Sequence, residues 1–204
     1  MNNILQASWQ RCWSTLSTAG DRPDLMQKLC TAYEEPQRKY HTLQHLTECL
    51  SLLDKNLDLA TEPSEVEIAL WFHDAIYDVK GSDNEAKSAE WAGKELASAG
   101  VSSECIARIQ QHIMATCHSA LPLLGDQTLL VDIDLSILGA ARPRFEEYEI
   151  QVRQEYSWVP GLIFRQKRRA ILKEFLARKP IYGTARMREK FEQQARENLA
   201  FSLK

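Results

Sequence analysis

The stretch I-A-L-W-F-H-D-A-I-Y-D, from Ile68 to Asp78, sets a histidine and an aspartate side by side in an otherwise apolar run. His73 keeps the helical spacing of the apolar residues before it, so we expect it on the inward stripe of a helix over 63–77. Asp74 lies about 100° further round that helix. A carboxylate in an apolar wall needs a cation or a set of hydrogen-bond donors. A divalent metal would satisfy both residues. In the alternative, His73 and Asp74 interact only with each other or cap a neighbouring helix.

The same helical period runs through almost the whole chain, and Gly and Pro fall between the periodic segments. We therefore predict an all-α fold, a compact multi-helix bundle, and one domain over residues 1–204. No alternating strand pattern, internal repeat or linker-like composition argues for a boundary. The predicted helices cover 2–17, 23–33, 42–59, 63–77, 83–99, 102–117, 127–138, 143–157, 162–178 and 185–202.

Several predicted helix ends have a local mechanism. Two serines stand three residues before a glutamate, which is the spacing of a capping box, and Thr184 is placed to cap the last helix. Two glycines suit the left-handed turn that often follows a helix. These positions are Ser64 with Glu67, Ser82 with Glu85, Gly100 and Gly139.

Composition limits the classes of function. The net charge of -3 and a pI near 6.0 give no global electrostatic reason to expect a nucleic acid partner. The N-terminus has no signal-peptide pattern, and no run reaches the roughly 18 apolar residues of a membrane span. The five cysteines are scattered without a C-x-x-C pair, which predicts a reduced, cytoplasmic protein. With no predicted membrane span, we expect no membrane partner.

Other polar residues also interrupt apolar faces. His45 shares the apolar side of the 42–59 helix with Leu46, Cys49, Leu50 and Leu53, and His41 lies one turn earlier. The run 129–138 contains Asp132 and Asp134, which point about 200° apart on a helix. At most one of these two acids should therefore face the core.

The order of these residues resembles the H…HD…D signature of the HD-domain metal-dependent phosphohydrolase superfamily. The surrounding strings are similar to a bacterial subfamily described as predicted HD phosphohydrolases, and the likeness covers about residues 38–200. Its core motifs would lie in about 38–140, with additional C-terminal helices in 143–202. The strings are Tyr40-His41-Thr-Leu-Gln-His45, Trp-Phe-His73-Asp74-Ala-Ile-Tyr-Asp78, Asp83-Asn84-Glu85, Ala115-Thr116-Cys-His118 and Pro180-Ile-Tyr-Gly-Thr184.

The resemblance implies a metal centre with four protein ligands: His45, His73, Asp74 and Asp134. His41 is the alternate for His45, because the family string Y-H-x-L-x-H offers both histidines. Asp132 is the alternate for Asp134, because Asp134-Leu135-Ser136 fits the family's A-D-R-L-like string less cleanly. Two imidazoles and two carboxylates would suit Mn, Mg, Fe, Co, Ni or Zn, and the sequence does not choose among them.

The implied reaction is attack of a metal-activated water on a small phosphate ester. Asp74 would serve as ligand and proton acceptor, and Glu85 could orient the water or a ligand. Donors near the phosphate would neutralise its developing charge. The candidates for that role are Arg38, His41, His112 and His118, and the last two also permit a second metal.

Three classes of function follow from this interpretation. The leading one is a metal-dependent phosphohydrolase acting on a nucleotide or another small phosphorylated substrate. The second is a nucleotide-binding regulatory module with little turnover. The third is a di-iron oxygenase on the same scaffold, which would need extra ligands such as His112 or His118. The substrate and the oligomeric state, including a homo-oligomer, are left open by the sequence.

Overall fold

The computed structural model describes residues 3–16, 20–117 and 125–204, and all the regular elements in these ranges are helices. The predicted all-α fold is confirmed. The chain divides into two compact units that meet in sequence between Val131 and Asp132, and each unit is described by itself. A single domain over 1–204 therefore stays a prediction. Within the described ranges, no helix is both long and apolar enough to cross a bilayer.

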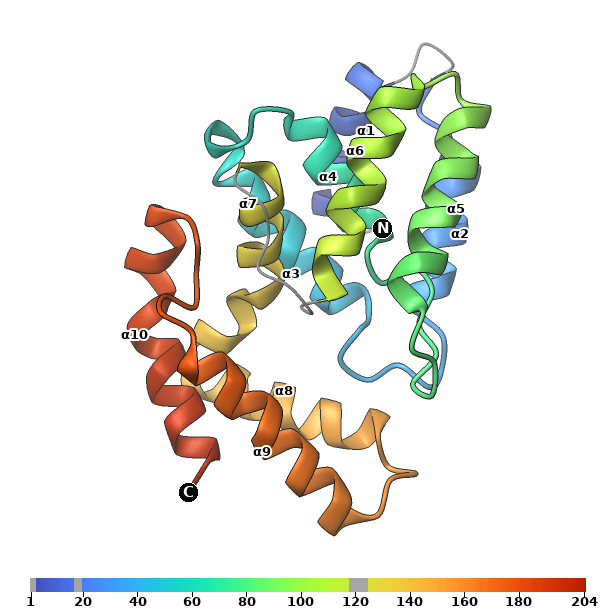
Figure 1. Cartoon of the computed structure of the whole chain (residues 1–204). Coiled ribbons are helices and arrows are strands. Elements are labelled where there is room, and N and C mark those ends of the chain that lie inside the picture. The colour runs from blue at the N-terminus through green and yellow to red at the C-terminus, as the bar shows by residue number, and fades with distance from the viewer. Residues whose placement is uncertain (1–2, 17–19, 118–124) are drawn as a thin grey trace. The chain divides into compact units, whose positions relative to one another are not determined.

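The first unit consists of an N-terminal helical bundle, drawn from blue through green to yellow in Figure 1. Two short 3-10 turns follow α3 and α6, where longer α-helices were predicted. The elements are α1 (Asn3–Leu16), α2 (Pro23–Tyr33), α3 (Leu43–Asp54), η1 (Leu57–Leu59), α4 (Pro63–Phe72), α5 (Asn84–Ser98), α6 (Ser103–Met114), η2 (Ala115–Cys117) and the start of α7 (Asp126–Asp134).

The second unit begins in the last turn of α7 and continues as a 3-10 turn and three helices. These elements are η3 (Leu135–Gly139), α8 (Arg142–Glu155), α9 (Gly161–Ala177) and α10 (Ala185–Ser202). The η3 turn packs against α8 and α10. Tyr182 donates from its hydroxyl to the carbonyl of Leu135, and Asn198 donates to the carbonyls of Leu138 and Ala140.

Helix α4 is the central element of the first unit. Every residue from Glu65 to Phe72 is buried, and the helix contacts α1, α3, α5 and α6. A helix that is buried all round belongs in the middle of a bundle rather than on its surface. Trp71 fixes it against α1, because its ring stands 4.9 Å from that of Trp9 and its indole N–H donates to the Ser8 hydroxyl at 3.0 Å.

Two glutamates lie on this buried helix, and each forms an ion pair with an arginine from a surrounding helix. Glu67 accepts two hydrogen bonds from Arg11 of α1, one of them at 3.0 Å. Glu65 accepts two from Arg108 of α6, one of them at 2.8 Å. Such bidentate pairs offset the cost of burying a carboxylate. The pairs therefore attach α1 and α6 to the central helix.

The predicted capping boxes are wrong. The N-cap residue of α4 is Glu62, and Glu67 bonds to Arg11 instead of Ser64. The N-cap residue of α5 is Asp83, which makes no side-chain cap, although Ser82 was the predicted cap. Thr184 does precede α10, but it makes no capping bond.

The two predicted glycine turns have different outcomes. Gly100 has φ +78°, which confirms the left-handed turn after α5. Gly139 lies inside η3 and is not among the residues with positive φ, so its predicted turn is wrong. A Cβ there would stand only 2.6 Å from the Cβ of Phe191. Gly139 thus permits a close approach of η3 to α10.

The Arg11 pair gives a prediction for stability. Arg11→Met would leave the Glu67 side chain, 1% exposed, without its cation, whereas the Arg11 side chain is 33% exposed. We expect a loss of about 2 kcal/mol in the free energy of unfolding, below the roughly 3–5 kcal/mol of a fully buried pair. Urea denaturation followed by tryptophan fluorescence measures the loss.

The matched control for this prediction is Lys94→Met. It removes the cation of the exposed Lys94–Glu90 pair on α5, and it should leave the stability unchanged because exposed pairs contribute little. Equal losses in Arg11→Met and Lys94→Met would contradict the role given to Arg11.

Candidate metal centre

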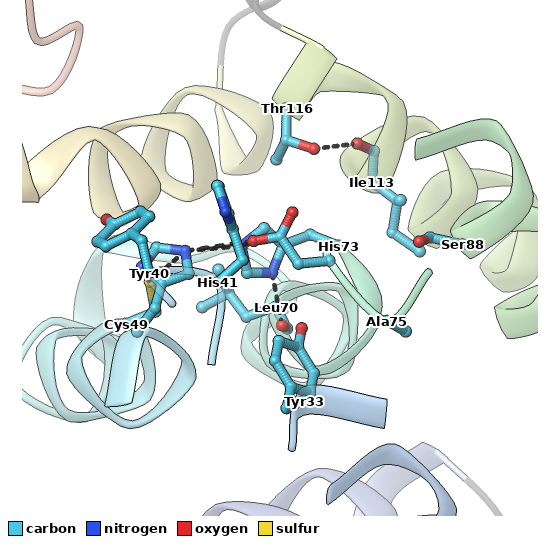
Figure 2. A network of polar contacts seen from close by, with 12 residues as sticks. Tyr33, Tyr40, His41, Cys49, Leu70, His73, Ala75, Ser88, Ile113 and Thr116 are labelled. Atoms are coloured by element: carbon cyan, nitrogen blue, oxygen red, sulfur yellow. Dashed lines mark hydrogen bonds and ion pairs between the residues drawn. The ribbon is translucent and has the colours of Figure 1, made fainter. Parts of the chain in front are cut away.

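Three of the predicted ligands converge in the first unit. The Nε2 atoms of His45 and His73 lie 3.1 Å apart, and the Oδ2 atom of Asp74 lies 3.0 Å from Nε2 of His73 and 3.4 Å from Nε2 of His45. Figure 2 shows His73 within this network of polar contacts, whose hydrogen bonds and ion pairs are dashed. His45 comes from the first turn of α3, and the other two residues follow the end of α4. Segments about 30 residues apart in sequence thus bring three donor atoms to one point.

His73 is oriented by the end of α4. The helix stops at Phe72, five residues before the predicted end, and His73 occupies the C-cap position. Its Nδ1 lies 2.7 Å from the carbonyl oxygen of Leu70, and the hydroxyl of Tyr33 donates to the carbonyl of Trp71. A carbonyl only accepts, so Nδ1 carries a hydrogen. Nε2 can then donate a second hydrogen to Asp74 in a charged ring, or present its lone pair to an ion in a neutral ring.

Arg38 holds the backbone beside this histidine, which differs from its predicted role in substrate binding. Its side chain is fully buried, and its guanidinium donates to the carbonyls of His41, Asp74 and Ala75. Its role in substrate binding stays a prediction. Arg38 ties the segment before α3 to the segment after α4, so it is a positioning residue for Asp74.

His41 lies at the edge of the same cluster. Its ring is half-buried, stacks on Tyr77 at 4.2 Å between centroids, and stands 6.0 Å from the ring of His45. Figure 2 shows His41 beside Tyr40, whose ring also contacts His45 at 4.8 Å. From this position the His41 side chain could contact a molecule bound at the edge of the cluster.

The electrostatics favour an ionised Asp74. Burial alone would raise the pKa of its carboxyl, but the imidazoles of His73 and His41 and the hydrogen bonds from His45 and His73 hold that pKa well below its usual range. The side chain keeps 16% exposure, so it is not sealed from solvent. Asp74 is therefore an ionised carboxylate that can bind a cation.

The spacing of the three donor atoms fits a divalent metal ion. Nitrogen and oxygen ligands stand about 2.0–2.2 Å from such an ion, so two ligands at right angles are roughly 3.0 Å apart and two at the tetrahedral angle roughly 3.4 Å. The observed separations of 3.0, 3.1 and 3.4 Å span this range. Two imidazoles and one carboxylate on one side of an ion would leave its other positions open for water or substrate.

Cys49 is a member of the cluster that the sequence interpretation treated only as an apolar residue. Its Sγ atom lies 3.7 Å from Nδ1 and 3.8 Å from Nε2 of His45. Ligand atoms of His45, Cys49 and His73 all lie within 4.8 Å of one another. The signal in the sequence was the spacing of four residues after His45, which places both side chains on one face of α3.

Other predicted residues have different surroundings. The buried His112 of α6 has Asp126 and Glu65 as its acidic neighbours, and burial lowers its pKa. Glu85 lies beside Cys117, where it adds to the burial that raises the pKa of that thiol. His118 falls outside the described residues. Catalytic roles for all three stay predictions.

Asp132 and Asp134, near the end of α7, belong to the second unit. Both oxygens of Asp132 accept backbone N–H groups before α10, from Gly183 at 2.8 Å and from Thr184 at 2.7 Å. Asp132 therefore holds the start of α10, which favours Asp134 over it as a ligand. Asp134 is the last residue of α7 and is half-buried. Its role as fourth ligand stays a prediction.

His112 gives a prediction for the dependence of stability on pH. Its Nδ1 is buried without a hydrogen-bond partner among the described residues. Because burial puts its pKa below the unfolded value of about 6.5, its contribution to stability is present above that value and is lost as the pH falls through the folded pKa. We expect the free energy of unfolding to fall more steeply on acidification from about pH 7.5 to about pH 5 in the parent than in His112→Gln. Parallel curves in urea denaturation would contradict this assignment.

The chain was also compared with known proteins. No protein-family model, no curated protein and no solved structure matches it.

Proposed function

We propose that the protein is a metal-dependent phosphohydrolase that acts on a nucleotide or another small phosphate ester. The observation that carries the proposal is the convergence of His45 Nε2, His73 Nε2 and Asp74 Oδ2 at separations of 3.0 to 3.4 Å. Glu65 and Glu67 of the same central helix are each bonded to an arginine. Asp74 instead lies beside the imidazoles of His45 and His73, and imidazole is a common metal ligand in proteins.

His45, His73 and Asp74 would hold the ion, and Asp134 is proposed as the fourth ligand. A bound divalent ion would lower the pKa of a coordinated water toward about 7 and polarise a phosphoryl oxygen. Tyr33 and Arg38 contribute by fixing the carbonyls around His73 and Asp74, so that the donor atoms need little rearrangement. Such preorganisation is worth more than contacts formed only after binding.

The remaining steps would use groups at the rim. Asp74 is ionised and partly exposed, so its carboxylate can hydrogen-bond the attacking water, and its role as proton acceptor rests on the sequence resemblance. His41, half-buried on Tyr77, would donate to a phosphoryl oxygen and neutralise part of its charge. His118 is proposed for the same task from the sequence alone.

The test combines metal content with product analysis. Elemental analysis of the purified full chain should find at least one divalent ion, and incubation with a panel of nucleotides and phosphate esters should release phosphate or a phosphorylated product. Metal without release would favour a binding module. Iron with oxygen consumption would favour an oxygenase, which the set of two histidines and one carboxylate also suits.

Asp74→Ala should lose both the bound metal and hydrolysis. The substitution removes the only carboxylate of the three converging donors, and loss of a ligand costs at least the roughly 10–100-fold in metal affinity that follows from losing a ligand's partner. Circular dichroism checks that the variant is folded. Asp58→Ala, an exposed acid in η1, is the matched control and should keep both properties. Full activity in Asp74→Ala would refute the proposed centre.

A further inference from the structure

We propose that Cys49 is a further ligand of this metal, bound as a thiolate, and that it selects zinc-like ions such as Zn²⁺, Co²⁺ or Fe²⁺ over Mg²⁺ and Mn²⁺. The inference rests on the proposed metal centre and deepens it. It assigns a chemical role to a buried nucleophile that the hydrolytic mechanism does not use. It also favours metal ions that bind sulfur among those that the sequence left open.

The position of Cys49 carries the inference. It follows His45 by four residues within α3, so both side chains leave the same face of one rigid helix. The side chain is buried, and its sulfur stands 3.8 Å from Nε2 of His45, the atom that faces His73. The spacing H-x₃-C on one helix also falls within the range used by zinc sites.

The separation of sulfur and nitrogen fits shared coordination. A metal–sulfur bond of about 2.3 Å and a metal–nitrogen bond of about 2.1 Å at the tetrahedral angle put the two ligand atoms roughly 3.6 Å apart. The observed 3.8 Å is a few tenths of an ångström longer, and Sγ stands equally near Nδ1 of His45, at 3.7 Å. Shared coordination therefore requires the Cys49 side chain to turn toward the Nε2 side of the ring when the ion binds.

Thiolate coordination would determine the class of ion. Sulfur ligands favour zinc, ferrous iron and related ions, whereas magnesium and manganese prefer oxygen. When the bond forms, the Cys49 S–H bond breaks, its proton leaves to solvent, and both bonding electrons come from sulfur. No group is oxidised or reduced in this step.

Cobalt substitution of the full chain tests the proposal directly. Protein stripped of metal is titrated with Co²⁺ while the near-ultraviolet and visible spectra are recorded, and Zn²⁺ and Mg²⁺ affinities are measured by competition. The parent should show a sulfur-to-cobalt charge-transfer band that saturates with binding. Cys49→Ser should lose the band and at least roughly 10-fold in Zn²⁺ affinity. Cys30→Ser, a cysteine of α2, is the matched control and should keep both.

The outcomes separate the two proposals. If the parent binds Co²⁺ without the band, or if Cys49→Ser and Cys49→Ala bind Zn²⁺ as the parent does, Cys49 is not a ligand and the metal centre stands without it. If the parent binds no Co²⁺ or Zn²⁺ at all, the metal centre itself is refuted together with the ligand role. The spectrum of the parent decides the matter even where a variant fails to fold.

Discussion

The burial of α4 on all sides is the constraint on which the first unit depends. A helix in that position has no access to bulk water, so every charged group on it must be compensated by a neighbour. Glu67 and Glu65 are compensated by Arg11 and Arg108, which join α1 and α6 to the centre. Two residues after the helix ends, Asp74 is compensated by imidazoles. The polar groups on and just after α4 thus specify both its packing and the position of the candidate metal site.

The sequence predicted the helices well because the period of apolar residues is a local property. The ranges 23–33 and 185–202 agree with α2 and α10 at both ends. The end of α4 was missed because it depends on groups that come from elsewhere in the chain. Tyr33 and Arg38 satisfy carbonyls around His73, and no pattern within 63–77 indicates them.

The candidate site was predictable in part, because a polar residue on an apolar helix face can be recognised from the local sequence. His45 and His73 stood out because a histidine on an apolar stripe is unusual, and the structure brings their Nε2 atoms together. Cys49 did not stand out, since a cysteine on an apolar face is ordinary. Arg38 was predicted to neutralise charge on a phosphate, whereas its donors bond to backbone carbonyls inside the unit. Side-chain partners of this kind are set by tertiary packing.

Different parts of the chain orient the donor residues and form the rim of the site. The groups that orient His73 and Asp74 come from residues 33–41 and from α4 itself. The loop 78–83, which follows Tyr77 at the rim, makes its own turn through Asp78 and Asn84. Substitutions in that loop can therefore reshape the approach to the site and leave the donor atoms where they are. Under the proposed function, new substrate preferences would be accessible through surface changes alone, without rebuilding the interior.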